Sequence, residues 1–267
     1  ENKYFNFDNY NILILGGNSG FGFEILKLFS KYNNKILIVG RNSSKLANAK
    51  SFVENNYQNK KILTIKSDLK TENNVKSLFK LIKSKKTNKI DIIINCIGIN
   101  KRNSIEKLSY KDWQDVINTN LNIAFLISKY GLPFLKKSKF PRYINFTSIF
   151  STVSFEDRTP YSSSKGGLLM LTKTLALEWA KYNITVNSIS PGPFLTELNL
   201  PVLQNKKNYE EFCKRIPLKR FGNPEEILTS ILFLSSKYSS YVTGSNIIVD
   251  GGWTSKWSRL YTLQVQV

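Results

Sequence analysis

Short runs of apolar residues, rich in isoleucine, leucine and valine, recur along the chain. They lack the polar–apolar alternation of a half-exposed strand and are therefore typical of strands covered on both faces. The pattern predicts strands at residues 11–15, 35–39, 61–65, 91–95, 143–147, 184–189 and 246–250.

Between these runs, apolar residues recur every three to four positions, which is the period of an amphipathic helix. Residues 23–32 and 73–84 carry this pattern, and residues 161–182 form a longer, mostly apolar stretch. Strands that alternate with helices favour right-handed strand–helix–strand units. We therefore predict an α/β protein with a doubly wound parallel β-sheet flanked by helices on both faces. No repeat or break in composition divides the chain, so a single domain is expected over residues 1–267.

The composition is that of a folded domain. Of the 267 residues 41% are hydrophobic, and the longest apolar runs are far too short to cross a bilayer. The first ten residues show neither a long apolar region nor a cleavage-site pattern, so no secretory signal is expected. Two cysteines, Cys96 and Cys213, and the absence of histidine argue against a disulfide framework and a zinc site. We expect no metal and a reducing, cytoplasmic location.

The formal net charge of +20 admits two interpretations. One is an anionic partner such as nucleic acid, a membrane surface or an acidic carrier protein. The other is a bias in composition, favoured by scattered basic residues and by an excess of 32 lysines over 7 arginines. Dedicated phosphate recognition would use more arginine. We therefore expect no nucleic-acid partner and no membrane partner.

The stretch ILGGNSGFG, residues 14–22, has the spacing of a phosphate-binding turn. It follows the first predicted strand and precedes a helix. Its glycines would permit a sharp turn, a close approach of the backbone to phosphate and tight packing of helix on strand. Taken alone, the spacing also suits a purely structural turn. Leu15 stands where a small hydroxyl residue would be expected.

A second motif, YSSSK, places Tyr161 and Lys165 four residues apart on the long predicted helix, so that both side chains share one face. An ammonium beside a phenol favours the phenolate and lowers the pKa of the tyrosine, as a general acid or base requires. The alternative is a tyrosine packed under a solvated lysine. Ser148 follows a predicted strand, where ligands of α/β proteins gather, although a serine there also suits a helix cap or turn.

Together these motifs resemble the short-chain dehydrogenase/reductase family in its classical form, over residues 11–253. The glycine motif matches, and Tyr161 follows Ser148 by the expected 13 residues. The segments NSISPGPFLTEL, PLKRFGNPEEI and VDGGW complete the pattern. The resemblance implies a single-domain Rossmann fold and a catalytic set of Asn120, Ser148, Tyr161 and Lys165.

The resemblance also implies a role for each catalytic residue. Tyr161 exchanges the hydroxyl proton of the substrate, and Ser148 positions the reacting oxygen. Lys165 lowers the pKa of the phenol and orients the nicotinamide ribose. Asn120 holds, through its backbone, a water that links Lys165 to solvent. The implied cofactor-binding residues are Gly16, Asn18, Ser19, Gly20, Phe21, Gly22, Arg41, Asp68, Leu69, Asn95, Gly98, Tyr161, Lys165, Pro191, Gly192, Phe194 and Thr196.

Arg41 follows the second predicted strand, at the position where family members that prefer NAD usually carry an acidic residue. A guanidinium can pair with the 2′-phosphate of NADP, so we predict NADP(H) as the preferred cofactor, with NAD(H) as the alternative. An Arg41 that only lies in solvent is the competing interpretation. Leu15, Cys96 and Ile97 depart from the family's motifs, and we expect Leu15 and Ile97 to replace polar contacts with apolar packing.

Residues 98–121, 176–198 and 216–227 most resemble the branch of sugar, polyol and gluconate-type dehydrogenases. This predicts an oxidoreductase that transfers hydride between nicotinamide and a secondary alcohol or ketone of a small-molecule substrate. Lys101 and Arg102 suit a carboxylate or phosphate of that substrate, or else are solvated loop charges. The candidate substrate residues are Lys101, Arg102, Ile149, Phe150 and Glu156.

Two other functions stay open at this point. A 3-oxoacyl-[acyl-carrier-protein] reductase would suit the basic surface, but Leu177 stands where those reductases have an arginine. A non-catalytic nucleotide-binding regulator is the second alternative. The family resemblance also implies a homotetramer or homodimer and a substrate loop at about 190–222. The tail at about 254–267 extends past the usual end of the family, and we expect it either to cover a neighbouring subunit or to fray.

Overall fold

Every predicted strand is present, with bounds within two residues of those expected. The computed structural model describes residues 6–57, 59 and 61–255. The strands are β1 Asn11–Leu15, β2 Lys35–Gly40, β3 Ile62–Lys66, β4 Ile92–Asn95, β5 Arg142–Phe146, β6 Thr185–Pro191 and β7 Asn246–Val249.

These strands form one parallel sheet in the order β3-β2-β1-β4-β5-β6-β7, as the doubly wound prediction requires. The direction of the crossovers reverses between β1 and β4, which are neighbours in the sheet. Leu15 at the end of β1 is in register with Val39 of β2 and with Asn95 of β4. In open α/β sheets such a reversal point leaves a crevice for ligands outside the carboxyl ends of the strands.

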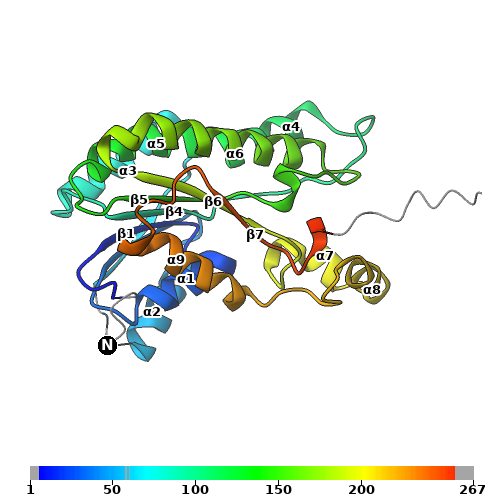
Figure 1. Cartoon of the computed structure of the whole chain (residues 1–267), viewed down its shortest axis with the longest axis horizontal. Helices are drawn as coiled ribbons and strands as arrows, with labels where there is room; N and C mark the ends of the chain where they lie inside the picture. Colours follow the sequence, from blue (N-terminus) through cyan, green and yellow to red (C-terminus); the bar gives the residue numbers. More distant parts are fainter. Residues whose placement is uncertain (1–5, 58, 60, 256–267) are drawn as a thin grey trace, which may run out of the picture.

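Helices cover both faces of the sheet (Figure 1). One face carries α1, α2 and α9, and the opposite face carries α3, α5 and α6. The helices are α1 Gly20–Phe29, α2 Ser43–Asn56, α3 Glu72–Ser84, α4 Tyr110–Ile117, α5 Ile123–Leu135, α6 Thr159–Trp179, α7 Leu200–Leu203, α8 Lys206–Arg215 and α9 Leu228–Ser235.

The apolar runs supply two separate cores, because successive strand residues point to opposite faces. In β1, Ile12 and Ile14 pack in the core under α1, α2 and α9, whereas Leu13 and Leu15 pack in the core under α3, α5 and α6. All four side chains are fully buried. A strand covered on both faces therefore needs apolar residues at consecutive positions, which explains why the runs show no alternation.

Side-chain caps begin several of the helices. Asn42 accepts a hydrogen bond from a backbone N–H of the first turn of α2 (3.0 Å), Thr71 does so for α3 (3.2 Å), and Ser109 for α4 (3.0 Å). Such a cap contributes about 1 kcal/mol to helix stability. The cap on α2 matters for the site, because it starts that helix directly after Arg41 at the end of β2.

The expected loop at about 190–222 contains α7 and α8 and connects β6 to the segment before α9 (Figure 1). Of the predicted tail 254–267, residues 256–267 lie outside the described residues. Within the described part of the chain, none of the helices has both the length and the apolar character that a membrane crossing requires.

Candidate active site

The glycine turn between β1 and α1 has backbone conformations and contacts that require glycine. Gly16 and Gly20 have positive φ angles of 77° and 50°. A Cβ on Gly22 would lie 2.1 Å from the carbonyl oxygen of Gly16, so no side chain fits there. At Gly20, by contrast, nothing lies within 4 Å of such a Cβ. The turn is thus packed on its inner side and open on its outer side, at the N-terminus of α1.

Leu15 anchors this turn through apolar packing, as expected. It is fully buried in the core under α3, α5 and α6, and Ile97 packs against the same core. The backbone supplies the polar ties: the Gly16 N–H donates to the Val39 carbonyl (2.8 Å), and the Cys96 N–H donates to the Leu15 carbonyl (3.0 Å). The turn is therefore joined to both neighbouring strands without a side-chain hydroxyl.

A cavity of about 850 Å³ extends from this turn to the ends of β4, β5 and β6. Its volume is in the range of small-molecule and cofactor sites. The predicted cofactor-binding residues other than Asn95 all line it. Asn95 lies beneath it and is buried, where its side chain donates to the Asn145 side chain (3.1 Å) and accepts from the Ile97 N–H (3.2 Å).

Ser148, Tyr161 and Lys165 meet at one end of this cavity. Ser148 follows β5, and the other two residues share one face of α6. Tyr161 is 7% exposed and Lys165 is 2% exposed, so Lys165 is no solvated surface lysine. The Lys165 Nζ donates to the Phe146 carbonyl (2.7 Å) at the end of β5. Burial lowers the pKa of Lys165 to about 8.

The electrostatics of Tyr161 differ from the sequence-based expectation. Burial raises the pKa of its phenol, and hydrogen bonding to Ser148 and the charges of Arg158 and Arg102 act in the opposite direction. The Lys165 ammonium is directed to the Phe146 carbonyl and lies 5.8 Å from the centre of the phenol ring.

Asn120 lies in a π-helical turn, Asn118–Asn122, that joins α4 to α5. Its side chain accepts from the Ile99 N–H (2.8 Å) and donates to the Ile99 carbonyl (3.0 Å) and to the Ser164 hydroxyl (3.0 Å). Asn120 does not line the cavity but ties the segment after β4 to α6. Single π-helical turns of this kind are frequent at functional sites.

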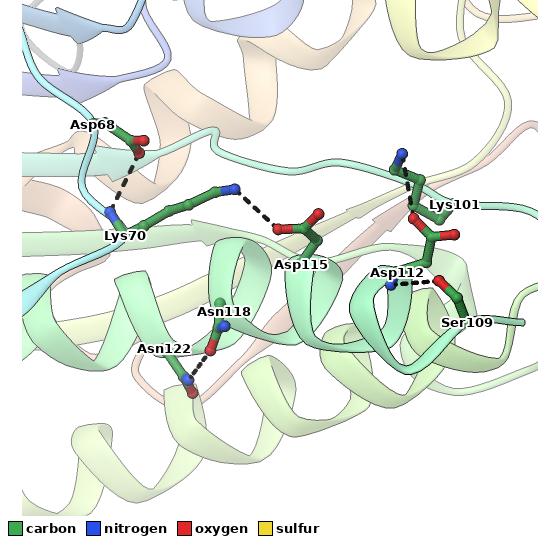
Figure 2. A network of polar contacts seen from close by, with 8 residues as sticks. All are labelled: Asp68, Lys70, Lys101, Ser109, Asp112, Asp115, Asn118 and Asn122. Carbon is green, nitrogen blue, oxygen red and sulfur yellow. Dashed lines mark hydrogen bonds and ion pairs between the residues drawn. The ribbon is translucent and has the colours of Figure 1, made fainter.

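The candidate substrate residues divide into two groups. Arg102, Ile149 and Phe150 line the cavity, whereas Lys101 and Glu156 are exposed and do not. Lys101 forms an ion pair with Asp112 (3.4 Å) at the start of α4 (Figure 2). Neighbouring residues of an extended segment point in different directions, so Lys101 leaves the cavity as Arg102 enters it.

Sequence reasoning missed three basic residues that line the cavity, Arg158, Lys45 and Lys70. Arg158 is buried and lies three residues before Tyr161, a spacing of about one helical turn that pointed to it. Lys45, in the first turn of α2, pairs with Glu197 (2.8 Å) from the segment after β6. Lys45 lies in the first helical turn after Arg41, and this position in the sequence could have identified it as a residue of the site.

The cavity lining after β3 includes Asp68 and Lys70, which belong to a set of polar contacts (Figure 2). The Asp68 side chain accepts from the Lys70 N–H (3.4 Å), and the Lys70 side chain reaches Asp115 of α4 (3.1 Å). Asn122 donates to Asn118 (2.7 Å) within the π-helical turn. This network links the wall formed by Asp68 and Leu69 to α4.

Comparison with known proteins supports the resemblance over nearly the whole chain. A family model described as enoyl-(acyl carrier protein) reductase matches residues 16–254. The chain is 32% identical over 252 residues to 5-keto-D-gluconate 5-reductase of Escherichia coli (strain K12), covering 94% of this chain and 98% of that protein. It is 38% identical over 243 residues to the 3-oxoacyl-[acyl-carrier-protein] reductase of Buchnera aphidicola subsp. Schizaphis graminum, covering 90% and 95%.

Among solved structures, the chain is similar to a gluconate 5-dehydrogenase from Burkholderia cenocepacia J2315, determined in complex with NADP and tartrate. The TM-score is 0.88 with 28% sequence identity, and the match covers 95% of this chain and 98% of that one. The fold is thus shared with a dehydrogenase whose structure was determined with NADP bound.

Proposed function

Because the chain belongs to the short-chain dehydrogenase/reductase family and is an oxidoreductase, we propose that it transfers hydride between NADP(H) and a sugar, polyol or sugar-acid substrate. The reacting carbon is a secondary alcohol or ketone. The observation that carries this proposal is the buried Tyr161, held beside Ser148 and Lys165 at one end of the cavity that starts at the glycine turn.

The residues at the glycine turn fit a dinucleotide. Ser19 makes no side-chain cap on α1, so N–H groups of the first turn stay available to a phosphate at the helix N-terminus. The open side of Gly20 leaves room for that phosphate. Bound NADP(H) supplies the hydride acceptor or donor, and the protein supplies placement and proton transfer.

The protein's own residues handle the proton at the substrate oxygen. Tyr161 donates a proton to the oxygen of a ketone during reduction and takes it from the alcohol during oxidation. The Ser148 hydroxyl hydrogen-bonds the same oxygen and keeps it next to the phenol. Lys165 orients the cofactor ribose, and Asn120 holds the segment after β4 against α6. Burial of Tyr161 and Lys165 excludes bulk water from this exchange.

A substrate panel tests this function. The enzyme is mixed with NADPH and, in turn, a keto sugar acid, a neutral keto sugar and a 3-oxoacyl thioester, and NADPH absorbance is followed. Reduction of a keto sugar or keto sugar acid is expected. A protein that binds neither NADPH nor NADH would refute the oxidoreductase assignment. Binding without turnover on a broad panel of ketones and polyols would indicate a nucleotide-binding regulator instead.

One observation favours a second candidate, a 3-oxoacyl-[acyl-carrier-protein] reductase. The identity to the Buchnera reductase, 38%, exceeds the 32% identity to the Escherichia coli keto-gluconate reductase. Against this candidate, Leu177 is 81% exposed on α6 and offers no charge to an acidic carrier protein. Rapid reduction of the thioester in the panel, with no reduction of keto sugars, would establish it.

We predict that replacing Arg41 with alanine weakens NADPH binding about tenfold, the worth of one charge-assisted hydrogen bond, and leaves NADH binding nearly unchanged. Arg41 lines the cavity directly after β2, where a 2′-phosphate would be met by its guanidinium. Fluorescence titration of both nucleotides measures the ratio. Lys66→Ala is the control, since Lys66 is exposed at the end of β3 and lies outside the cavity lining. Equal losses for the two nucleotides would contradict a 2′-phosphate role.

We also propose a homotetramer or homodimer in the cytoplasm. Phe125 on α5 and Met170 and Leu177 on α6 are exposed apolar side chains on helices that family members use for assembly. Light scattering of the purified protein measures the number of subunits. Cys96 and Cys213 are both unpaired, which favours a reducing compartment.

A further inference from the structure

Arg158 is a buried arginine in the wall of the cavity, beside the phenol of Tyr161. It is 6% exposed and stands at the N-cap of α6. Its guanidinium donates to the Asp157 carbonyl (3.2 Å) and lies 5.9 Å from the centre of the Phe155 ring. Within the part of the chain that the structure describes, this is the one hydrogen bond of the guanidinium, and Arg158 lines the cavity.

No carboxylate of residues 6–57, 59 and 61–255 lies within ion-pair distance of Arg158 or of its neighbour Arg102. Arg102 also lines the cavity and is partly buried. Burial, followed by repulsion from Arg102, lowers the pKa of Arg158 to about 10, although the nearby charge of Asp157 acts in the opposite direction. Placing two like charges in one desolvated wall opposes folding unless an opposite charge joins them.

A second buried arginine shows what a structural arginine looks like in this fold. Arg142 in β5 donates through Nε and Nη2 to the Ser236 carbonyl and through Nη1 to the Pro141 carbonyl. Its donors are thus used within the protein, at a distance from the cavity lining. Arg158 is buried to a similar degree, but among the described residues its guanidinium makes a single hydrogen bond, and it lines the cavity beside Tyr161.

We propose that Arg158 and Arg102 together bind an acidic group of the substrate, so that this enzyme acts on an oxo acid and its hydroxy acid in preference to neutral sugars and polyols. The proposal rests on the proposed function and adds Arg158 as a residue that determines specificity. Two guanidiniums match a carboxylate or a phosphate group, whose oxygens accept paired N–H donors. Occupation by that group offsets positive charge in the wall and fixes the substrate relative to Tyr161.

Binding of three matched ligands tests the proposal without turnover. Gluconate and glucitol differ by a carboxylate in place of a hydroxymethyl group, and glucitol 6-phosphate carries a phosphate instead. Each ligand is titrated calorimetrically into the protein saturated with NADPH. Because NADPH is already reduced, it accepts no hydride from these alcohols, and no turnover occurs. The titrations are then repeated without nucleotide. The wild-type protein should bind gluconate, glucitol 6-phosphate or both at least about tenfold more tightly than glucitol. The stronger of the two acidic ligands identifies the group that the arginines bind.

Arg158→Gln should weaken binding of that acidic ligand by about 10- to 100-fold and leave glucitol binding unchanged. Arg215→Gln is the matched control, because Arg215 lies over the same Phe155 ring (4.9 Å) but is exposed and outside the cavity lining. Arg158→Lys keeps the charge and loses the planar guanidinium, so it should bind the acidic ligand with intermediate affinity. This variant also tests the proposal if Arg158→Gln does not fold.

The proposal is overturned if the wild-type protein binds glucitol as well as both acids, or binds none of the three. It is also overturned if Arg158→Gln weakens glucitol and the acids equally, since that pattern indicates a purely structural role. Because these titrations involve no hydride transfer, they separate the proposal from the proposed function. If the protein binds gluconate through Arg158 but reduces no substrate of the panel, the proposed oxidoreductase function is refuted and the acid-binding role of Arg158 is not.

Discussion

Replacing Tyr161 with phenylalanine should reduce kcat by about 10²- to 10⁴-fold, the usual contribution of a general acid or base. The substitution removes only the hydroxyl, and the ring keeps its edge-on contact with Phe150 at 6.4 Å between centres. NADPH affinity and thermal stability should therefore change little. Steady-state kinetics together with a nucleotide titration separate these effects.

Tyr143→Phe is the matched control for this variant. Tyr143 is also buried, but it lies in β5 and its hydroxyl contacts Ser128 (3.3 Å) and the Ala124 carbonyl (3.3 Å), outside the cavity lining. Its loss should cost about 1 kcal/mol of stability with activity retained. A Tyr161→Phe enzyme with full activity would overturn the assigned acid and base.

The direction of the pKa shift of Tyr161 also predicts how each reaction depends on pH. Burial holds the phenol protonated above its ordinary range, and reduction uses the protonated phenol. Oxidation requires the phenolate, whose fraction increases as the pH rises toward the pKa. The kcat/KM for alcohol oxidation should thus increase with pH through the neutral and mildly alkaline range. An oxidation rate that is flat over that range would contradict Tyr161 as the base.

Replacing Gly22 with alanine should unfold the cofactor turn. The added Cβ would lie 2.1 Å from the Gly16 carbonyl oxygen and 2.8 Å from its carbon, and both are backbone atoms that move only if the turn opens. We expect a loss of about 1–3 kcal/mol or more in the free energy of unfolding. NADPH affinity should fall by at least about tenfold, the worth of one charge-assisted hydrogen bond. Urea denaturation and fluorescence titration measure the two losses.

Gly166→Ala provides the comparison on another helix. A Cβ at Gly166, inside α6, meets only the Ser151 carbonyl oxygen at 3.7 Å, which is an ordinary contact. Alanine in a helix interior is favoured over glycine by about 0.5–1 kcal/mol, so this variant should be slightly more stable. If Gly22→Ala retained wild-type stability and nucleotide affinity, the turn would not be the rigid element described above.

The parts of this protein that were predictable from sequence are those set by local repetition. Burial on both faces makes each strand a continuous apolar run, and the four-residue spacing of Tyr161 and Lys165 places them on one helix face. The glycine positions were equally clear, since their conformations admit few other residues. The parallel, doubly wound sheet followed from the alternation of strands and helices.

What sequence reasoning missed depends on the direction of single side chains. Lys101 and Arg102 are neighbours of the same charge, yet one pairs with Asp112 and the other lines the cavity. Arg158 stands three residues before Tyr161, but nothing in the pattern of charges marks it as buried. The π-helical turn around Asn120 differs from an α-helix by one residue, which apolar periodicity does not resolve.

Because Leu15 anchors the cofactor turn by apolar packing, the strength with which the turn is held in place depends on temperature. A hydroxyl would fix the turn by a hydrogen bond, whereas Leu15 and Ile97 fix it by removing apolar surface from water. That driving force is largely entropic near room temperature and weakens on cooling. The side-chain contribution to holding the turn in place therefore declines in the cold, and the backbone bonds from Gly16 and Cys96 carry a growing share.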